Sequence, residues 1–168
     1  MEPGRKKGVV IFAVSCLVTL LFAQACSFVV EHYLDEGNSV QVLSFVYFTH
    51  VRNMGGIFGL MQGKGWMFTV MSILVLGGLL AYILRFEGIR NYEYFCYGLI
   101  AGGGMSNITD RLVYGSVIDF IDVRGISFWN YIFNTADVMI HAGIWPLLVI
   151  SLYQIRKQRQ QQKLAAPI

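Results

Sequence analysis

The sequence predicts an all-α membrane protein with four transmembrane helices, and three observations support this. The chain is 55% hydrophobic and only 14% charged, with a mean hydropathy of +0.55. Soluble domains carry about 25% charged residues, so this chain has too few to cover a water-facing surface. Four long apolar runs contain no charged residue, and the lysines and arginines gather at the ends of these runs.

The apolar runs lie at 9–30, 65–84, 94–109 and 138–155. About 20 apolar residues cross a bilayer as a helix, and helices are expected because lipid offers backbone groups no partners. The first two runs reach that length, whereas the third and fourth must include polar neighbours, which a helix that lines a polar interior tolerates. We therefore expect helices at about 9–30, 65–84, 94–109 and 136–155 within one polytopic domain, 1–168.

The basic residues are divided unevenly between the connecting segments. With the N-terminus inside, nine lie on the cytoplasmic side and four on the outer side. The positive-inside rule then places both termini in the cytoplasm and the segments at about 31–64 and 110–134 outside. The inner group is Arg5, Lys6, Lys7, Arg85, Arg90, Arg156, Lys157, Arg159 and Lys163, and the outer group is Arg52, Lys64, Arg111 and Arg124.

The N-terminal segment has two interpretations. Basic residues, an apolar stretch and then Ala23-Gln24-Ala25-Cys26 resemble a signal peptide with a cleavage site. The apolar run continues to Val30, however, which favours a retained helix. The intact mass of the purified protein distinguishes the two.

Both outer segments contain strand-like stretches. Residues 40–48 are rich in β-branched and aromatic side chains, which predicts one or two short strands lying on the membrane surface. In residues 117–123, the alternation places Asp119 on the opposite face from Ile118 and Phe120.

Four aspartates follow the third apolar run: Asp110, Asp119, Asp122 and Asp137. Ionisable groups near membrane depth are costly, so they are candidates for function. Two carboxylates close together cannot both ionise cheaply, and such a pair can activate a water with one member and protonate a scissile carbonyl with the other. Asp119 and Asp137 could form this pair, although aspartates that flank a helix start are just as often helix caps.

Neighbouring polar residues also have two interpretations. Arg111 either anchors a helix end beside Asp110 or binds a carboxylate or a substrate carbonyl. Asn53, Asn107 and Asn134 either hydrogen-bond an extended peptide or cap turns, which is the commoner role.

The sequence offers no recognisable site for a metal, a cofactor or nucleic acid. The three cysteines, Cys16, Cys26 and Cys96, lie inside apolar runs without zinc-binding spacing. The basic residues form no patch interleaved with aromatic side chains. We therefore expect no metal, no cofactor and no nucleic-acid partner.

Three motifs resemble those of the lipoprotein signal peptidase, or signal peptidase II, family. The first is NMGGIFG at 53–59, the second is GGGMSNITDR at 102–111 with GSVIDF at 115–120, and the third is FNTAD at 133–137. Their order, spacing and four-helix context agree with the family, and the resemblance covers most of the chain.

The resemblance implies four transmembrane helices with a small extracytoplasmic β-cradle and loop. It implies an aspartyl endopeptidase of the bacterial inner membrane, active at the outer face and blocked by the cyclic peptide globomycin. The substrate would be a prolipoprotein with a diacylglyceryl cysteine, cut just before that cysteine. Asp119 and Asp137 would be catalytic, and the substrate and membrane lipid would meet Asn53, Gly55, Asn107, Arg111, Asn134 and Ala136. We expect a monomer.

The chain departs from the family pattern near the outer end of the first helix. Members usually carry an aspartate and, four residues later, a lysine, where this chain has Ala23 and Ser27 around a retained Gln24; Ser106 also replaces a usual glycine. These changes leave open a non-catalytic or altered-substrate paralogue that binds lipoproteins. A transporter or proton channel is a third hypothesis, but it would need charges deeper in the bilayer.

Overall fold

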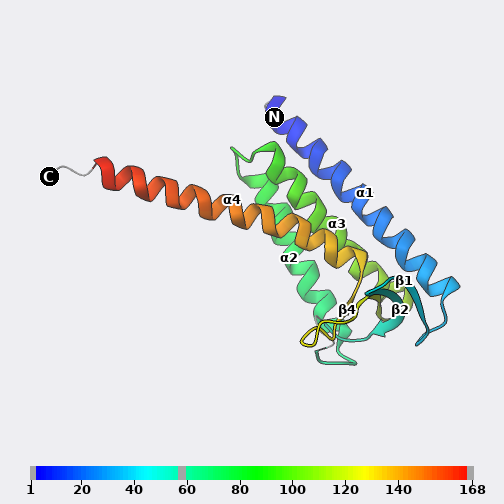
Figure 1. The fold of residues 1–168 in the computed structure, drawn as a ribbon. Coiled ribbons are helices and arrows are strands. Elements are labelled where there is room, and N and C mark those ends of the chain that lie inside the picture. Colours follow the sequence, from blue (N-terminus) through cyan, green and yellow to red (C-terminus); the bar gives the residue numbers. More distant parts are fainter. Residues whose placement is uncertain (1–2, 57–59, 166–168) are drawn as a thin grey trace.

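Four helices form a bundle that carries a small β-sheet at one end (Figure 1). The computed structural model describes residues 3–56 and 60–165, so Ile57, Phe58 and Gly59 of the first motif lie outside the described residues. The helices are α1 (Pro3–Tyr33), α2 (Gly65–Arg85), α3 (Asn91–Tyr114) and α4 (Thr135–Ala165). The strands are β1 (Ser39–Leu43), β2 (Val46–Asn53), β3 (Val117–Val123) and β4 (Ile132–Phe133).

Within the described residues, three helical segments are long and apolar enough to cross a membrane: Gly4–Tyr33, Gly65–Arg85 and Thr135–Gln162. The mostly helical architecture and a small sheet are therefore confirmed, whereas the predicted fourth span is not among the three. Helix α3 has 24 residues, which extend about 36 Å and could cross a core about 30 Å thick. Its hydropathy is lowered by the polar side chains that it carries near its C-terminal end.

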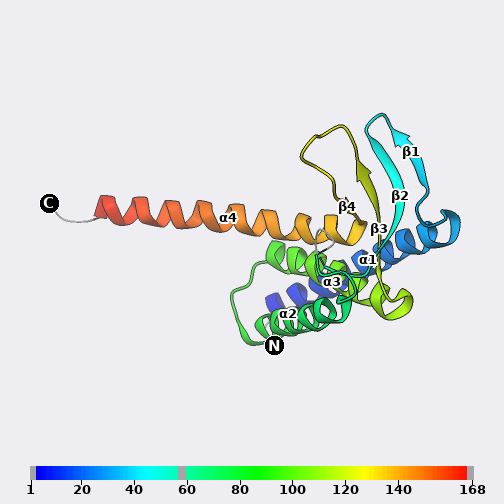
Figure 2. The same ribbon diagram turned by 90° about the horizontal axis from the view of Figure 1, so that it is seen from below.

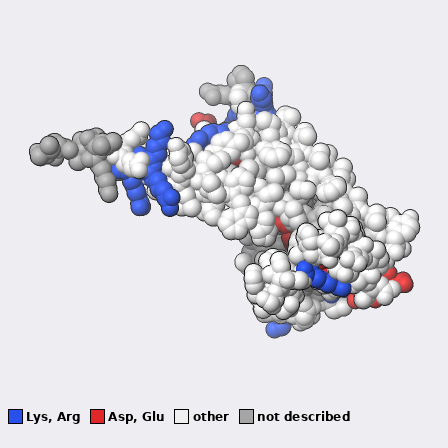
Figure 3. All heavy atoms as spheres, viewed as in Figure 1, with Lys and Arg blue, Asp and Glu red and all other residues white. Residues whose placement is uncertain are grey.

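The surface charges are arranged at the two ends of the molecule (Figure 3). Lysine and arginine side chains gather on the C-terminal half of α4 and near the start of α1, and charges of both signs lie around the sheet. A broad, almost uncharged surface lies between them. This distribution is typical of a bundle that passes through a bilayer.

Helix α3 packs against all three other helices through small residues. Four small side chains, Ser15, Thr19, Ala23 and Ser27, are buried at intervals of four on one face of α1. A Cβ atom on Gly102 would lie 2.5 Å from the Cys16 carbonyl oxygen, and one on Gly103 would lie 2.6 Å from the Ala136 carbonyl oxygen. Close backbone approach of this kind drives helix association in lipid, where larger apolar side chains gain little.

The sheet is antiparallel, with its strands in the order β1-β2-β3-β4. The strand-rich stretch at 40–48 forms parts of two strands, which project away from the helices (Figure 2). Strand β3 pairs with β2 along most of its length, and with β4 only at Ile121 and Asp122.

The first half of β3 is buried on both of its faces. Ile118 and Phe120 pack with Val30 at the end of α1 and form a small apolar core. Because side chains alternate along a strand, Asp119 points to the opposite side, toward the start of α4.

Candidate active site

Asp119 and Asp137 are brought together from β3 and from the first turn of α4. Asp119 is only 5% exposed, and its Oδ1 accepts a hydrogen bond of 2.7 Å from Nδ2 of Asn134. Asn134 immediately precedes α4, and its Oδ1 accepts the backbone N–H of Asp137 at 2.9 Å. Asn134 therefore caps the helix, as one of its two interpretations predicted, and it also bridges the two aspartates.

Two further asparagines donate hydrogen bonds to the carboxylates, one to each aspartate. Nδ2 of Asn53 donates to Oδ2 of Asp119 at 2.9 Å, and Nδ2 of Asn107 donates to Oδ1 of Asp137 at 2.9 Å. The remaining Oδ2 of Asp137 receives a longer bond, 3.4 Å, from the backbone N–H of Asn134. All four carboxylate oxygens therefore accept a hydrogen bond, and the donors come from β2, α3 and the turn before α4.

The electrostatics of this carboxylate pair favour the retention of a proton. Burial, and then the nearby Asp137 carboxylate, raise the pKa of Asp119 from 3.8 to about 7, although hydrogen bonds from Asn53 and Asn134 and the charge of Arg111 oppose the rise. Near neutral pH, Asp119 is thus close to half protonated, and one ionised and one protonated carboxyl can coexist.

Arg111 joins α3 to the segment that follows β2. Its guanidinium donates to the Asn107 carbonyl oxygen at 3.2 Å and to the Gly55 carbonyl oxygen at 3.0 Å. Its Nε–H is buried and has no hydrogen-bond partner within the described residues. No carboxylate oxygen of the described residues lies within 4.0 Å of Arg111, so its positive charge acts on the aspartates without forming an ion pair.

Gly55 and Ala136 occupy different surroundings. The backbone N–H of Gly55 donates to Oδ1 of Asn53 at 3.0 Å, which helps to fix that side chain beside Asp119. Ala136 is 2% exposed and lies in the contact between α3 and α4, against Gly103. The structure therefore gathers five of the six expected pocket residues around the aspartates and places Ala136 in the adjoining helix contact.

A second buried carboxylate, Asp110, faces α1 instead. Gln24 donates to its Oδ1 at 2.7 Å, and its Oδ2 accepts hydrogen bonds from the Ser27 hydroxyl at 3.1 Å and the Ile118 backbone N–H at 3.2 Å. Gln24 also donates to the Ser106 hydroxyl at 3.0 Å. Gln24 and Ser27 thus form a neutral clamp on Asp110 that ties α1 to α3 and, through Asp110, to the start of β3.

Sequence reasoning missed the roles of Gln24 and Gln62. Gln24 was detectable, because a glutamine inside an uncharged apolar run is a costly polar group that needs a partner. Gln62 donates to Oδ1 of Asn53 at 3.2 Å, and nothing in its local sequence indicated that contact. In residues 3–56 and 60–165, no three histidine, cysteine, aspartate or glutamate side chains lie close enough together to hold a metal ion.

An apolar helical bundle with an amide-held pair of aspartates, one buried and one half-buried, defines the class of membrane-embedded aspartyl proteases. The family model described as signal peptidase (SPase) II matches residues 15–154. The lipoprotein signal peptidase of Fusobacterium nucleatum subsp. nucleatum is 36% identical over 145 residues, which cover 85% of this chain and 87% of the relative. That of Anoxybacillus flavithermus is 30% identical over 155 residues, which cover 92% of each chain.

Solved structures agree with these sequence relationships. A bacterial membrane enzyme determined by the in meso method is 25% identical and superposes with a TM-score of 0.75, over 85% of this chain and 87% of that one. A second such structure is 26% identical, with a TM-score of 0.72 over 84% and 91% of the two chains. The chain belongs to the signal peptidase II family, and it is a multi-pass membrane protein.

Proposed function

We propose that this protein is an aspartyl endopeptidase that removes the signal peptide from prolipoproteins, cutting just before a diacylglyceryl-modified cysteine. The observation that carries the proposal is the arrangement of Asp119 and Asp137, which are held together by three asparagines in a chain of this family. The relatives described above carry the name of that activity.

In the proposed mechanism, the two aspartates share one proton and hold a water between them. The ionised carboxylate takes a proton from the water as its oxygen attacks the scissile carbonyl carbon, while the protonated carboxyl donates its proton to the carbonyl oxygen. The tetrahedral intermediate then collapses: the C–N bond breaks, the leaving amine takes a proton from one aspartate, and the other aspartate regains its proton as the new carboxyl group forms. The raised pKa of Asp119 supports this mechanism, because it keeps one proton available near neutral pH.

The surrounding residues are proposed to bind the substrate on either side of the cut. Asn53, Asn107 and Asn134 orient the aspartates, and they could exchange some of these hydrogen bonds for bonds to an extended peptide. Arg111 retains an unpaired Nε–H that could donate to a substrate carbonyl oxygen. Gly55 and Ala136 are proposed to support the pocket indirectly, because a Cβ on Gly55 would collide with the Leu60 carbonyl oxygen and Ala136 is packed against Gly103 of α3.

The proposed topology is a single polytopic domain, 1–168, with four spans. Helix α3 is the fourth span, because it packs against α1, α2 and α4 and turns its polar residues toward the aspartates and toward the clamp on α1. The uneven division of basic residues supports cytoplasmic termini and a site at the outer face of the bacterial inner membrane. We propose that the protein acts as a monomer surrounded by membrane lipid.

The test is a cleavage assay in detergent with a diacylglyceryl-modified prolipoprotein. Wild-type protein should release the signal peptide, whereas Asp119→Asn and Asp137→Asn should each lose at least about 1,000-fold in kcat, since neither retains an acid–base pair. Asp122→Asn is the matched control, because Asp122 lies on the same strand but bonds to Thr49 and Arg124. Wild-type turnover by both aspartate variants would refute the proposal.

The same assay addresses substrate choice. An otherwise identical prolipoprotein without diacylglycerol should be a poor substrate if the lipid is recognised. Nothing in the relatives favours the non-catalytic alternative, and the first helix still holds Asp110 through hydrogen bonds from Gln24 and Ser27.

A further inference from the structure

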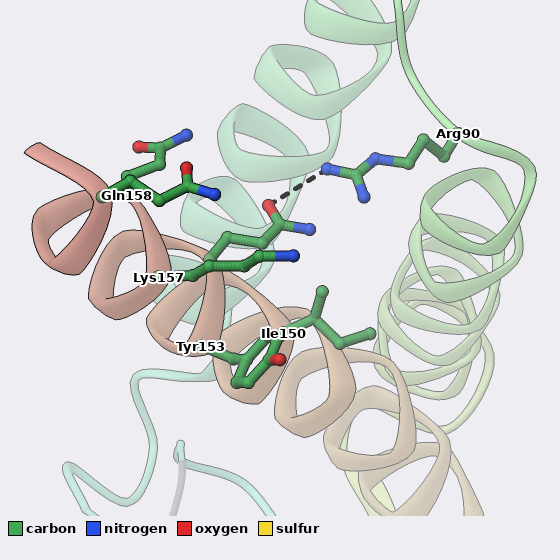
Figure 4. Close-up of a pocket in the computed structure, with 7 residues that line it drawn as sticks. Arg90, Ile150, Tyr153, Lys157 and Gln158 are labelled. Atoms are coloured by element: carbon green, nitrogen blue, oxygen red, sulfur yellow. Dashed lines mark hydrogen bonds between the residues drawn. The ribbon is translucent and has the colours of Figure 1, made fainter. Parts of the chain in front are cut away.

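A pocket of about 500 Å³ lies far from the carboxylate pair, near the end of the bundle where the chain starts (Figure 4). One wall is Arg90, the residue before α3, and the other is the second half of α4. The lining residues of α4 are Ile150, Tyr153, Gln154, Lys157, Gln158 and Gln161. In Figure 4, the Arg90 side chain reaches across toward α4, while Lys157 and Gln158 extend from α4 on the same side.

The lining contains two cations and no anion. The Arg90 guanidinium donates to Oε1 of Gln154 at 3.0 Å and lies 5.5 Å from the centre of the Tyr92 ring, so it is held toward α4 while several of its N–H donors stay available. Among the described residues, no carboxylate oxygen lies within 4.0 Å of Arg90 or Lys157. The two acidic residues nearest in the sequence are engaged elsewhere, because Glu87 lies 3.9 Å from the Arg5 guanidinium and Glu93 accepts the backbone N–H of Arg90.

Two cations with neighbouring amide and hydroxyl groups make a suitable site for a phosphate. Guanidinium and ammonium groups form short, charge-assisted hydrogen bonds with phosphate oxygens, and the glutamines can supply neutral donors to the same group. The present arrangement leaves the two positive charges without a compensating negative charge. A bound phosphate would supply one.

The pocket also spans the boundary between the apolar and polar parts of α4. Ile150 and Tyr153 belong to the uncharged run at 138–155, whereas Lys157 follows it. On the same helix, the sequence neighbours Val149 and Leu152 are 62% and 48% exposed, so an apolar strip continues from the level of the pocket toward the middle of the helix. A soluble phosphate would use only the cations, whereas a phospholipid would use the cations and the strip together.

We propose that this pocket binds the headgroup of an anionic phospholipid, with the phosphate between Arg90 and Lys157 and the acyl chains along the exposed apolar face of α4. Basic pockets between membrane helices on the inner side bind anionic headgroups in this way, since that leaflet carries negative charge. The proposal does not depend on the peptidase activity, because none of these residues touches the aspartates.

Binding is tested with the full-length protein in a neutral detergent, by native mass spectrometry during titration with phosphatidylglycerol. Phosphatidylcholine with the same acyl chains is the zwitterionic comparison, and glycerol 3-phosphate is the soluble phosphate. Wild-type protein should retain phosphatidylglycerol roughly tenfold more tightly than phosphatidylcholine, because only the former brings a net negative charge. Glycerol 3-phosphate should fail to displace it.

The informative variant is Arg90→Gln with Lys157→Gln, which should reduce phosphatidylglycerol retention roughly tenfold. The matched control is Arg156→Gln with Arg159→Gln, which removes the same charge from the same helix end without altering the lining, and should bind as wild type. Gln158→Glu, which adds a negative charge inside the pocket, should weaken binding independently. Equal retention by the first variant, equal loss in the control, or displacement by glycerol 3-phosphate would each overturn the proposal.

Discussion

Replacing Asp119 by asparagine should stabilise the folded protein, and should do so more at pH 8 than at pH 5. The pKa of Asp119 rises from 3.8 to about 7 on folding, chiefly through burial. An acid whose folded pKa is higher than its unfolded pKa favours folding only while it is protonated. Its ionisation therefore reduces the free energy of unfolding progressively between about pH 3.8 and pH 7.

The magnitude follows from the difference between the two pKa values. Each pKa unit corresponds to about 1.4 kcal/mol, so the full penalty of burying ionised Asp119 is about 4 kcal/mol above pH 7. At pH 5, somewhat under 2 kcal/mol of that penalty is already present, because only the unfolded chain is ionised there. Asparagine does not titrate, so the stabilisation by Asp119→Asn should be roughly 2–3 kcal/mol larger at pH 8 than at pH 5.

The assay is thermal unfolding in detergent at the two pH values. For a chain of this size, each kcal/mol corresponds to roughly 2–4 °C in Tm, so the gain from the substitution should be roughly 5–10 °C greater at pH 8. Any mismatch between the new amide and its asparagine neighbours is the same at both pH values and cancels in the comparison. Glu87→Gln, at a side chain that is 87% exposed, is the surface control and should change Tm little. An equal effect of Asp119→Asn at both pH values would refute the electrostatic reasoning.

Three further substitutions test other parts of the structure. Asn134→Ala removes both the bridge between the aspartates and the N-terminal cap of α4. The kcat for prolipoprotein cleavage should therefore fall roughly 100-fold, and the free energy of unfolding should fall by about 1 kcal/mol. An unchanged kcat would contradict the bridging role. Gly102→Ala should destabilise by about 1–3 kcal/mol in a detergent melt because α1 backbone lies 2.5 Å from the new Cβ, whereas Gly77→Ala, with nothing within 4 Å, should be tolerated. Gln24→Leu should cost about 1–3 kcal/mol by leaving Asp110 short of a donor, and a neutral result would show that the clamp is dispensable.

The helical part of the fold was predictable because bilayer thickness imposes a length on apolar runs. The run at 94–109 was harder to interpret, since Asn107 lies near its end and two charged residues, Asp110 and Arg111, follow directly. In the structure, Asn107 serves the aspartates and Asp110 faces the clamp on α1, so the residues that weaken the membrane signal are the ones that build the site.

The pairing of distant segments could not be read from sequence patterns. Asn53 lies 66 positions before Asp119 and reaches it because β2 pairs with β3 with an irregularity between Phe48 and Val51. That register depends on contacts across the whole sheet rather than on local composition. The motifs indicated which residues would meet, but the two roles of Asn134, as a helix cap and as a bridge, became evident only from the hydrogen bonds.

The two aspartates and the asparagines that hold them come from chain segments that are synthesised at very different times. Asn53 emerges first, Asn107 and Asp119 follow, and Asn134 and Asp137 arrive only as the last helix begins. A nascent chain that ends before Asn134 therefore has a carboxylate on β3 with neither its bridging amide nor its second carboxylate. Placement of the first turn of α4 is thus the step that creates the carboxylate pair, so any chemistry that needs both carboxylates is absent until that turn is formed.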